Sequence, residues 1–311
     1  MSTKQSPPTT LMQAIRYFAD PDVSNDFVAA LRWPDGPVCP RCEGTEHSYL
    51  TTRRLWKCRS CKRQFSVKVG SIFEDSPIPL DKWLTSIWMI ANAKNGISSY
   101  ELSRSIGLTQ KSAWFVLHRI RLAMETKTFD KMTGEVEVDE TFVGGKAKFM
   151  HRDERRRKIT GTGGSTANKT AVMGMLVRDG EVRATVVPDT KKATLQGLVR
   201  ANVEAGSAIY SDAAYAYQEL NAEYAHEFVD HAVRYVDGRV HTNSLENFWS
   251  LLKRGLKGTY VSVEPFHLFR YLDEQVFRFN ARKDNDLGRF VTMVARVAGR
   301  RLTYDQLTGR S

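Results

Sequence analysis

Four cysteines arranged as two Cys-x-x-Cys pairs constrain the fold of this chain more than any other feature of its sequence. Cys39 and Cys42 form the first pair, Cys58 and Cys61 the second, and fifteen residues lie between the pairs. Two such pairs can bind one Zn²⁺ tetrahedrally, each from its own turn, with a β-hairpin between them. Two disulfides are the alternative, but the sequence shows no secretory signal. We therefore predict a zinc ribbon with one structural Zn²⁺ over residues 31–76.

The chain is basic, which favours a polyanionic partner. It has 46 Lys and Arg against 35 Asp and Glu, a formal net charge of +11. Basic side chains that neutralise phosphates release counterions, so we expect double-stranded DNA as the partner. A solvated basic face without a ligand is the alternative. The ribbon contributes an acid-free run of candidate DNA contacts, interrupted by Trp56 and Phe65: Arg53, Arg54, Lys57, Arg59, Lys62, Arg63 and Lys68.

Length and composition predict a globular protein with several domains. The chain has 311 residues, of which 41% are hydrophobic, enough to bury more than one core. The longest weakly polar stretch, 83–93, is much shorter than a bilayer span. We expect a cytoplasmic protein without a membrane segment.

Helical periodicity follows the ribbon and predicts a helix-turn-helix over 77–130, after an N-terminal helical segment over 1–30. Ser98 or Ser99 can cap one helix, Gly107 turns the chain, and Thr109 can cap the next helix, 110–124. In that last helix, Ala113, Leu117, Ile120 and Met124 are expected to face the core and Gln110, Lys111, His118 and Arg121 to point outward. The candidate DNA contacts are Gln110, Lys111, Arg119 and Arg121. A small helical bundle that links two domains is the alternative.

From residue 131 to 282 the pattern predicts an RNase H-like α/β domain with a mixed five-stranded sheet. Alternation indicates strands over 135–143, 171–177 and 182–187, a helix over 192–205 and a strand over 208–212. A helix-like segment over 215–220, a weak strand over 227–231 and a long helix complete the order βββαβαβα. In such a fold the first and fourth strands lie side by side. The complete chain is thus an α+β multidomain protein.

Three acidic residues are the candidate catalytic metal ligands. Asp139 and Asp212 lie at the expected ends of two strands, and Glu246 lies near the start of the long helix. Three converging carboxylates suit two Mg²⁺ or Mn²⁺ ions, which cut and rejoin phosphodiesters. Glu137 and Glu140 are rival carboxylates beside Asp139, of which Glu140 should point away.

The helix that bears Glu246 has one apolar and one polar face. Leu245, Phe248, Trp249, Leu252 and Leu256 form the expected buried stripe. Lys253 is seven positions after Glu246, about 10 Å along the axis, and can bind the DNA backbone. Arg254 and Lys257 are further candidate DNA contacts. A capping box of Asn243 and Glu246, which needs no metal, is the alternative reading of the helix start.

Two further basic segments are candidate DNA contacts. An insertion over 146–169 includes Arg155, Arg156, Arg157 and Lys158 and continues into a Gly-rich stretch. A flexible solvated loop is its alternative. A basic C-terminal tail over 283–311 could bind DNA or a second protomer.

Taken together, these motifs make the chain resemble a DDE-type insertion-sequence transposase of the zinc-ribbon group, with an ISXO-two-like catalytic domain, in the insertion sequence fifteen-ninety-five family. The resemblance runs from about Phe27 to about Arg282. It is carried by Cys39-Pro-Arg-Cys42, Cys58-Arg-Ser-Cys61, Gly70-Ser-Ile-Phe73, Lys82-Trp83-Leu84, His118-Arg119-Ile120-Arg121, Val138-Asp139-Glu140-Thr141, Tyr210-Ser211-Asp212, the run 241–254 and Phe277-Arg278-Phe279-Asn280.

The resemblance implies residue roles and partners. It implies Asp139, Asp212 and Glu246 as metal ligands and Lys253 as a basic residue of the site, with Asn243 and Asn247 as alternative third ligands. It also implies a homo-oligomer that joins paired transposon ends to target DNA. Two other functions stay open: a DNA-binding regulator without catalytic activity, and an RNase H-like nuclease that hydrolyses DNA without transferring strands.

Overall fold

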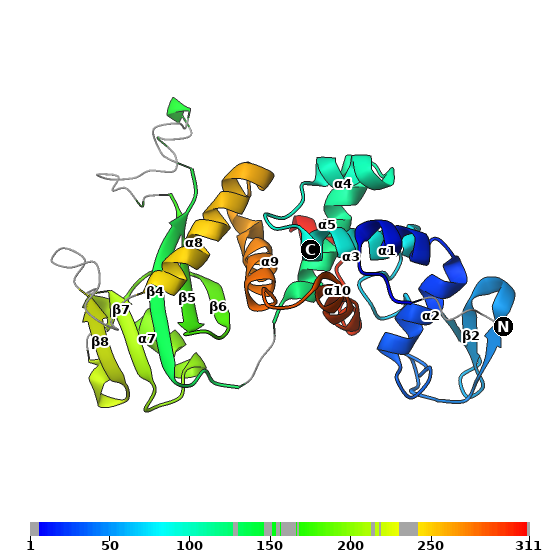
Figure 1. The fold of residues 1–311 in the computed structure, drawn as a ribbon, viewed down its shortest axis with the longest axis horizontal. Helices are drawn as coiled ribbons and strands as arrows, with labels where there is room; N and C mark the ends of the chain where they lie inside the picture. Colours follow the sequence, from blue (N-terminus) through cyan, green and yellow to red (C-terminus); the bar gives the residue numbers. More distant parts are fainter. Residues whose placement is uncertain are drawn as a thin grey trace. The chain divides into compact units, whose positions relative to one another are not determined.

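The structure, a computed structural model, divides the chain into two compact units. It describes residues 6–126, 130–145, 151–153, 156, 166, 168–212, 215–217, 219–229 and 242–309. The first unit combines Met1–Glu125 with Ala281–Ser311, and the second is Thr126–Asn280 (Figure 1). The second unit is therefore inserted between two segments of the first.

A three-stranded antiparallel sheet forms the ribbon in the first unit. Strands β1 (His47–Leu50) and β2 (Leu55–Cys58) form the predicted hairpin between the cysteine pairs, and β3 (Gln64–Phe65) pairs with β2. Trp56 and Phe65 are buried and stack on one another, and Trp33 packs against both rings. These aromatic residues form the core of the ribbon rather than part of a DNA-binding face.

The predicted helix pair is present with the predicted caps. The Ser98 side chain caps α4 (Ser99–Ile106), Gly107 ends it with φ +64°, and the Thr109 side chain caps α5 (Gln110–Met124). A left-handed φ of this kind favours glycine. The α-helices that precede α4 in the described part of the chain are α1 (Leu11–Phe18), α2 (Pro21–Arg32) and α3 (Leu80–Asn92).

The C-terminal segment is part of the first unit, which differs from the separate tail that we expected. Helix α10 (Asp286–Ala295) packs on α3, and its Phe290 contacts the rings of Phe18, Phe27 and Trp88. Helix α11 (Tyr304–Thr308) buries Leu307. The basic composition of the segment concealed apolar side chains that complete a core begun by the first helices.

The second unit is built on the predicted mixed five-stranded sheet. Strand β4 (Glu135–Val143) is antiparallel to β5 (Thr170–Val177) and parallel to β7 (Ala208–Asp212). Strand β6 (Val182–Val187) extends the sheet beyond β5, and β8 (Ala225–Val229) extends it beyond β7, giving the order β6-β5-β4-β7-β8. The first and fourth strands of the unit are therefore neighbours, as predicted.

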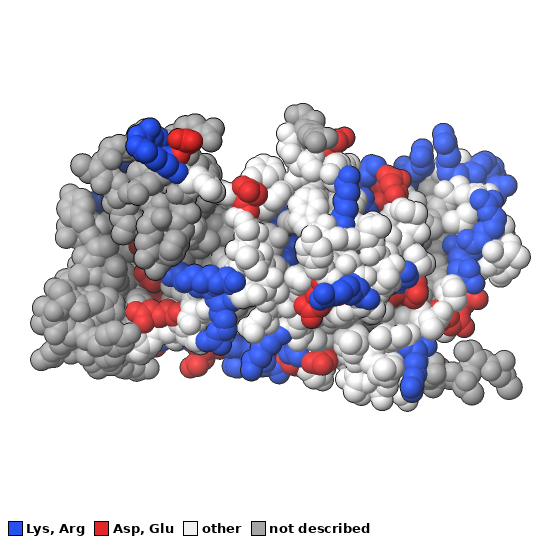
Figure 2. All heavy atoms as spheres, turned by 90° about the horizontal axis from the view of Figure 1, so that it is seen from above, with Lys and Arg blue, Asp and Glu red and all other residues white. Residues whose placement is uncertain are grey.

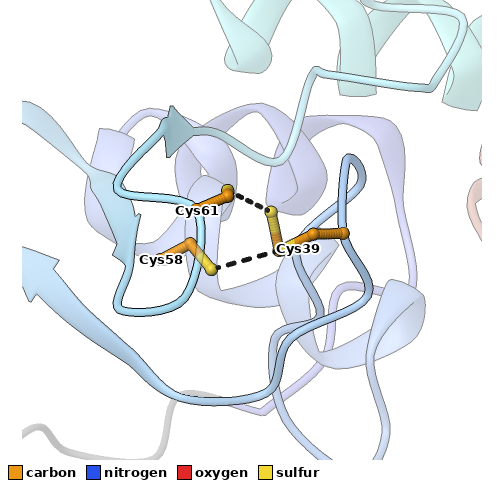
Figure 3. Close-up of side chains that lie close together, drawn as sticks. Cys39, Cys58 and Cys61 are labelled. Atoms are coloured by element: carbon orange, nitrogen blue, oxygen red, sulfur yellow. Dashed lines mark hydrogen bonds between the residues drawn. The ribbon is translucent and has the colours of Figure 1, made fainter.

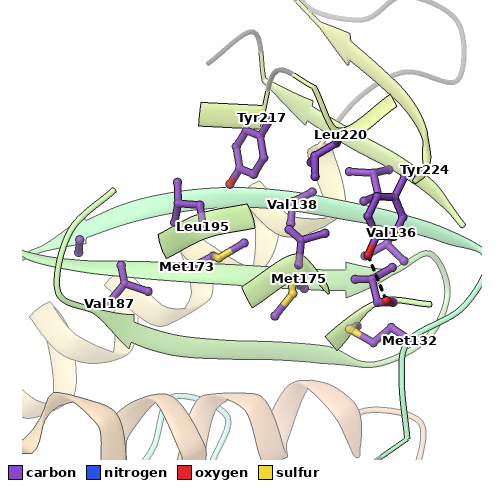
Figure 4. Packing of buried hydrophobic residues seen from close by; sticks show 14 residues of the cluster. Met132, Val136, Val138, Met173, Met175, Val187, Leu195, Tyr217, Leu220 and Tyr224 are labelled. Carbon is purple, nitrogen blue, oxygen red and sulfur yellow. Dashed lines mark hydrogen bonds between the residues drawn. The ribbon is translucent and has the colours of Figure 1, made fainter. Parts of the chain in front are cut away.

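Helices cover both faces of this sheet (Figure 1). Strand alternation directs Val136, Val138, Met173 and Met175 to the face covered by α7 (Lys192–Asn202), where Leu195 and Val199 complete the core (Figure 4). The opposite face packs Val172 and Leu176 against α8 (Asn243–Gly255) and α9 (Leu268–Asn280). Glu137 and Asp139 lie on this second face of β4, beside α8.

Three predicted elements differ in extent from the structure. Helix α7 ends at Asn202 rather than at residue 205. The helix-like segment after β7 consists of two 3-10 helices, Tyr215–Tyr217 and Leu220–Ala222. The weak strand is β8, two residues earlier than predicted. Helix and strand ends shift by one or two residues readily, because their local sequence defines them weakly.

We predict opposite effects for the same substitution at two glycines of the second unit. A Cβ at Gly174 would lie 2.6 Å from the Trp249 ring, whereas a Cβ at Gly197 of α7 meets nothing within 4 Å. Gly174→Ala should lower local stability by about 1–3 kcal/mol through overpacking. Gly197→Ala should raise it by about 0.5–1 kcal/mol through helix propensity. Amide hydrogen exchange of β5 and α7 measures both, and a neutral Gly174→Ala would contradict the packing described.

Candidate active site and zinc centre

The four cysteine sulfur atoms lie together at one end of the ribbon (Figure 3). All four Sγ atoms are within 4.8 Å of one another, with Cys39 3.7 Å from Cys61 and Cys42 3.6 Å from Cys58. A tetrahedral Zn²⁺ with Zn–S bonds of about 2.3 Å places its sulfurs about 3.8 Å apart. None of the cysteines forms a disulfide. The cluster therefore fits a structural zinc ion.

The two cysteine turns have matching backbone geometry. Glu43 follows the first pair with φ +60° and Lys62 follows the second, also with φ +60°. Cys39 and Cys58 are buried. The backbone N–H of Cys61 lowers the pKa of the Cys58 thiol to about 6. The backbone N–H of Gly44 lowers the pKa of the Cys42 thiol, but hydrogen bonds with Cys61 and Cys58 outweigh it and raise that pKa to about 12, so of these two thiols Cys58 is the one shifted toward the thiolate that binds zinc.

An open groove of about 440 Å³ lies between the sheet and α8 in the second unit. It brings together Asp139 and Glu246, two of the three predicted carboxylates, with the predicted basic residue Lys253. Its other lining residues are Glu140, Thr141, Trp249 and Ser250. The groove thus combines acidic and basic groups from one strand and one helix.

Asp139 lies in the middle of β4, not at its end as predicted. The residue is opposite Gly174 in the β4–β5 ladder, which continues to Val143. The pairing of β4 with β7, however, extends only to Glu137 and Tyr210. Asp139 is thus the second residue beyond the point where the two parallel strands separate. The backbone N–H of Glu140 donates to its Oδ1 (2.8 Å) and the Trp249 indole N–H to its Oδ2 (2.9 Å).

Asp212 occupies the equivalent position on β7. It is two residues beyond Tyr210, as Asp139 is two residues beyond Glu137, and the two strands are parallel neighbours. Adjacent strands are about 4.8 Å apart. The side chain of Asp212 lies outside the described part of the chain, so the structure defines its backbone register alone.

Helix α8 carries the third predicted ligand and the basic residue. Glu246 and Lys253 are half-buried and line the groove, whereas Asn243 and Asn247 are exposed and are not among its lining residues. Burial lowers the pKa of Lys253, and the charge of Asp139 opposes that shift. Arg254 and Lys257 are exposed.

The start of α8 is capped by Glu137, one of the two carboxylates that were rivals of Asp139 as a metal ligand. The N-cap is Thr242, which makes no side-chain cap bond, so the alternative Asn243–Glu246 capping box is not formed. Instead, the fully buried carboxylate of Glu137 accepts the Leu245 N–H (3.0 Å) and the Arg178 guanidinium Nε–H (3.2 Å). No local pattern identifies such a cap, because its two partners are 108 residues apart.

Glu140, the second rival, contributes to the groove lining, but its carboxylate is bound by Tyr217, a residue of the core on the α7 side of the sheet. The hydroxyl of the buried Tyr217 donates to its carboxylate. This agrees with the strand alternation that assigned Glu140 to the opposite face from Asp139.

Basic side chains gather over the part of the first unit that carries the ribbon (Figure 2). Arg53, Lys57, Arg59, Lys62 and Arg63 are exposed. Arg54 is half-buried and forms an ion pair with Asp22 of α2, with 2.5 Å between Nε and Oδ1. Lys68 donates to the carbonyls of Ser76 and Ile78, so it is engaged within the fold.

Helix α5 does not present the outward face that we predicted. Ala113, Leu117, Ile120 and Met124 are buried as expected, but His118, Arg119 and Arg121 are buried too. The Arg119 guanidinium donates to the carbonyls of Ile72, Glu74 and Leu302. Its burial lowers its pKa. The C-terminal segment contributes to this burial, since the Leu302 carbonyl accepts from Arg119 and the Tyr304 ring packs against Phe115. At the start of the helix Lys111 is exposed, with its ammonium over the Tyr304 ring, and Gln110 is half-buried.

The predicted basic insertion is described only in part. Arg156 is exposed. Arg155, Arg157 and Lys158 lie outside the described residues, as does most of 146–169. Among the described helices, none has both the length and the apolar character needed to cross a bilayer.

Comparison with known proteins gives consistent matches over both units. Residues 131–280 match the ISXO2-like transposase domain, and residues 22–64 match the transposase zinc-ribbon domain. A protein in the transposable element ISH50 of Halobacterium salinarum is 28% identical over 257 residues, or 79% of this chain and 86% of that protein. A transposase-like protein of Haemophilus influenzae is 31% identical over 101 residues, or 32% of this chain and 81% of that protein.

We predict that removal of zinc unfolds the ribbon. Structural zinc contributes on the order of 10 kcal/mol to small domains, more than three short strands supply. Chelation, or Cys58→Ser, should expose Trp56 and shift tryptophan emission to longer wavelength. Ser60→Ala alters the same turn without removing a sulfur and should leave the emission unchanged. An unchanged spectrum after complete removal of zinc would contradict the assignment.

We also predict that Arg119 stabilises the fold rather than contacting a ligand. Arg119→Ala leaves three backbone carbonyls without their donor and should lower the stability of the first unit by about 3 kcal/mol. Lys111→Ala, at the exposed start of the same helix, removes one cation–π contact with Tyr304 and should lower the melting temperature much less than Arg119→Ala. Thermal unfolding followed by circular dichroism compares the two. Equal melting temperatures would show that the carbonyl contacts of Arg119 contribute little.

Proposed function

Because the chain belongs to the ISXO2-like (IS1595) transposase family, we propose that it is a DDE-type DNA transposase that cleaves phosphodiesters at insertion-sequence ends and transfers the strands to target DNA. The observation that carries the proposal is the groove that Asp139 of β4 and Glu246 of α8 both line. Asp212 holds the matching register position on the neighbouring parallel strand.

The sheet topology supports an RNase H-like fold for the second unit. Three antiparallel strands are followed by a helix and by a fourth strand that is parallel to the first. Helix α8 then packs across the face that bears Asp139. This connectivity supports a site in which carboxylates from distant parts of the sequence converge beside the β4–β7 pair.

The donor set fits divalent magnesium or manganese. Asp139 and Glu246 offer carboxylate oxygens in a half-buried, open groove, and hard cations of this class prefer oxygen ligands. Asp139, Asp212 and Glu246 would hold two such ions. When bound, the ions supply Lewis-acid activation of the phosphodiester and of the attacking oxygen.

The residues of the chain bind and orient the DNA. Lys253 lines the groove seven residues after Glu246 and can bind a phosphate next to the scissile bond. Arg254 and Lys257 extend the positive charge along α8. The exposed ribbon residues Arg53, Lys57, Arg59, Lys62 and Arg63 are suited to phosphates of the duplex.

The first turn of α5 is the part of the predicted recognition helix that remains open to DNA. Lys111 is exposed there and Gln110 is half-buried, whereas the buried Arg119 and Arg121 are not proposed as contacts. The segment Arg155–Lys158 stays a predicted contact. We propose that the protein acts in the cytoplasm as a homo-oligomer, since two transposon ends must be joined to one target.

A strand-transfer assay with a labelled transposon end and Mg²⁺ or Mn²⁺ tests the proposal. Asp139→Asn, Asp212→Asn and Glu246→Gln should each lower the rate at least about 100-fold, the effect of losing roughly 3 kcal/mol of transition-state stabilisation. Lys253→Gln should lower it about 10-fold. Asn247→Ala, on the same helix, should retain activity because we assign the third ligand to Glu246.

Each contrary outcome identifies an alternative. Binding of ends without cutting under either metal would favour the DNA-binding regulator. Hydrolysis without joining, and without preference for terminal-repeat DNA over random duplex, would favour the nuclease. An active Glu246→Gln with an inactive Asn243→Ala or Asn247→Ala would assign the third ligand to that asparagine.

A further inference from the structure

The Trp249 indole is hydrogen-bonded to the proposed metal ligand Asp139. Trp249 is 4% exposed and donates its Nε1–H to Oδ2 of Asp139 at 2.9 Å. The Glu140 backbone N–H donates to the other oxygen, Oδ1, at 2.8 Å. Two donors on different oxygens fix the plane of the carboxylate.

We propose that Trp249 is a positioning residue, whose indole N–H holds the Asp139 carboxylate in the orientation that binds the divalent ion. This inference rests on the proposed function, since it assigns Asp139 to the metal. Donors to metal-binding carboxylates reduce the freedom of the ligand before the metal arrives. Trp249 is neutral, so it orients the carboxylate without competing with the cation through charge, as Lys253 would if it paired with Asp139.

The sheet is shaped to receive this indole. Gly174 is the cross-strand partner of Asp139, and a Cβ there would lie 2.6 Å from Cζ2 and 2.8 Å from Cη2 of Trp249. The next strand places the small Ala184 opposite Gly174. The missing side chain lets the ring lie on β5 with its N–H directed at Asp139. The absence of a side chain at Gly174 is therefore what allows Trp249 to reach Asp139.

The position of Trp249 in the sequence makes the contact directly observable. It is the only tryptophan within 126–280, because the other five lie between residues 33 and 114. In full-length protein with ¹⁵N-labelled tryptophan, Trp249→Phe assigns its indole N–H resonance by loss of one peak. That resonance should shift in Asp139→Asn before any metal is added.

Metal binding supplies the second spectroscopic reading. With zinc bound in the ribbon, substoichiometric Mn²⁺ should broaden the Trp249 indole resonance more than the other five, and Asp139→Asn should remove the difference. A Trp249 resonance that is unaffected by Asp139→Asn would overturn the inference. Absence of any Mn²⁺ effect, together with an inactive wild type, would instead overturn the proposed function.

The variant Trp249→Phe keeps an aromatic ring but removes the donor. It should bind Mn²⁺ about 10-fold more weakly, as measured by electron paramagnetic resonance of the free ion. Its strand-transfer rate should fall at low Mn²⁺ and recover as Mn²⁺ is raised. A packing defect would not recover in this way.

Phe248→Leu is the matched control. Phe248 is a fully buried neighbour on α8 that packs edge-to-face with Phe279 and belongs to the same core. This variant should lose thermal stability but bind Mn²⁺ like the wild type. If an active wild type and Trp249→Phe bind Mn²⁺ equally and show the same Mn²⁺ dependence, the positioning role is wrong while the transposase proposal stands.

Discussion

The geometry of the groove depends on the hydrogen bonds that the buried Glu137 carboxylate accepts. This carboxylate accepts the Leu245 N–H at the start of α8, and Trp249, four residues later, donates to Asp139. Four residues advance a helix by about 6 Å, and two residues advance a strand by about 6.7 Å. The two contacts therefore match in spacing and hold α8 along β4. Arg178 balances the Glu137 charge, which would otherwise be costly to bury.

The two faces of the sheet have different roles: one is closed by apolar side chains, and the other carries the carboxylates beside α8. The α7 face is closed by apolar side chains from β4, β5, β6 and β7, with Tyr217 directed to Glu140 at its margin (Figure 4). The α8 face combines an apolar core with two carboxylates in the middle of β4. Those carboxylates are tolerated because each has donors from α8 or the backbone, and because β7 separates from β4 beside Asp139.

The features that the sequence predicted correctly are those that residues close together in the chain determine. Ser98, Gly107 and Thr109 define helix ends, alternation defines β4 and β6 to the residue, and the spacing of four cysteines defines their cluster. What it missed depends on contacts between distant segments. Arg119 appears basic and helical, but its partners include a carbonyl 183 residues away. The cap supplied by Glu137 and the docking of the basic C-terminal segment are hidden for the same reason.

The insertion of the second unit between two segments of the first has a genetic consequence. A stop codon just after Asn280 would leave every residue of the sheet, of α8 and of α9 encoded. The lost residues would be those that complete the other unit: Phe290 against Phe18 and Trp88, and the Leu302 carbonyl that accepts from Arg119. A truncation near the C-terminus would thus damage the first unit, although its zinc ribbon is encoded far upstream. The second unit, which contains the groove, would keep all of its residues.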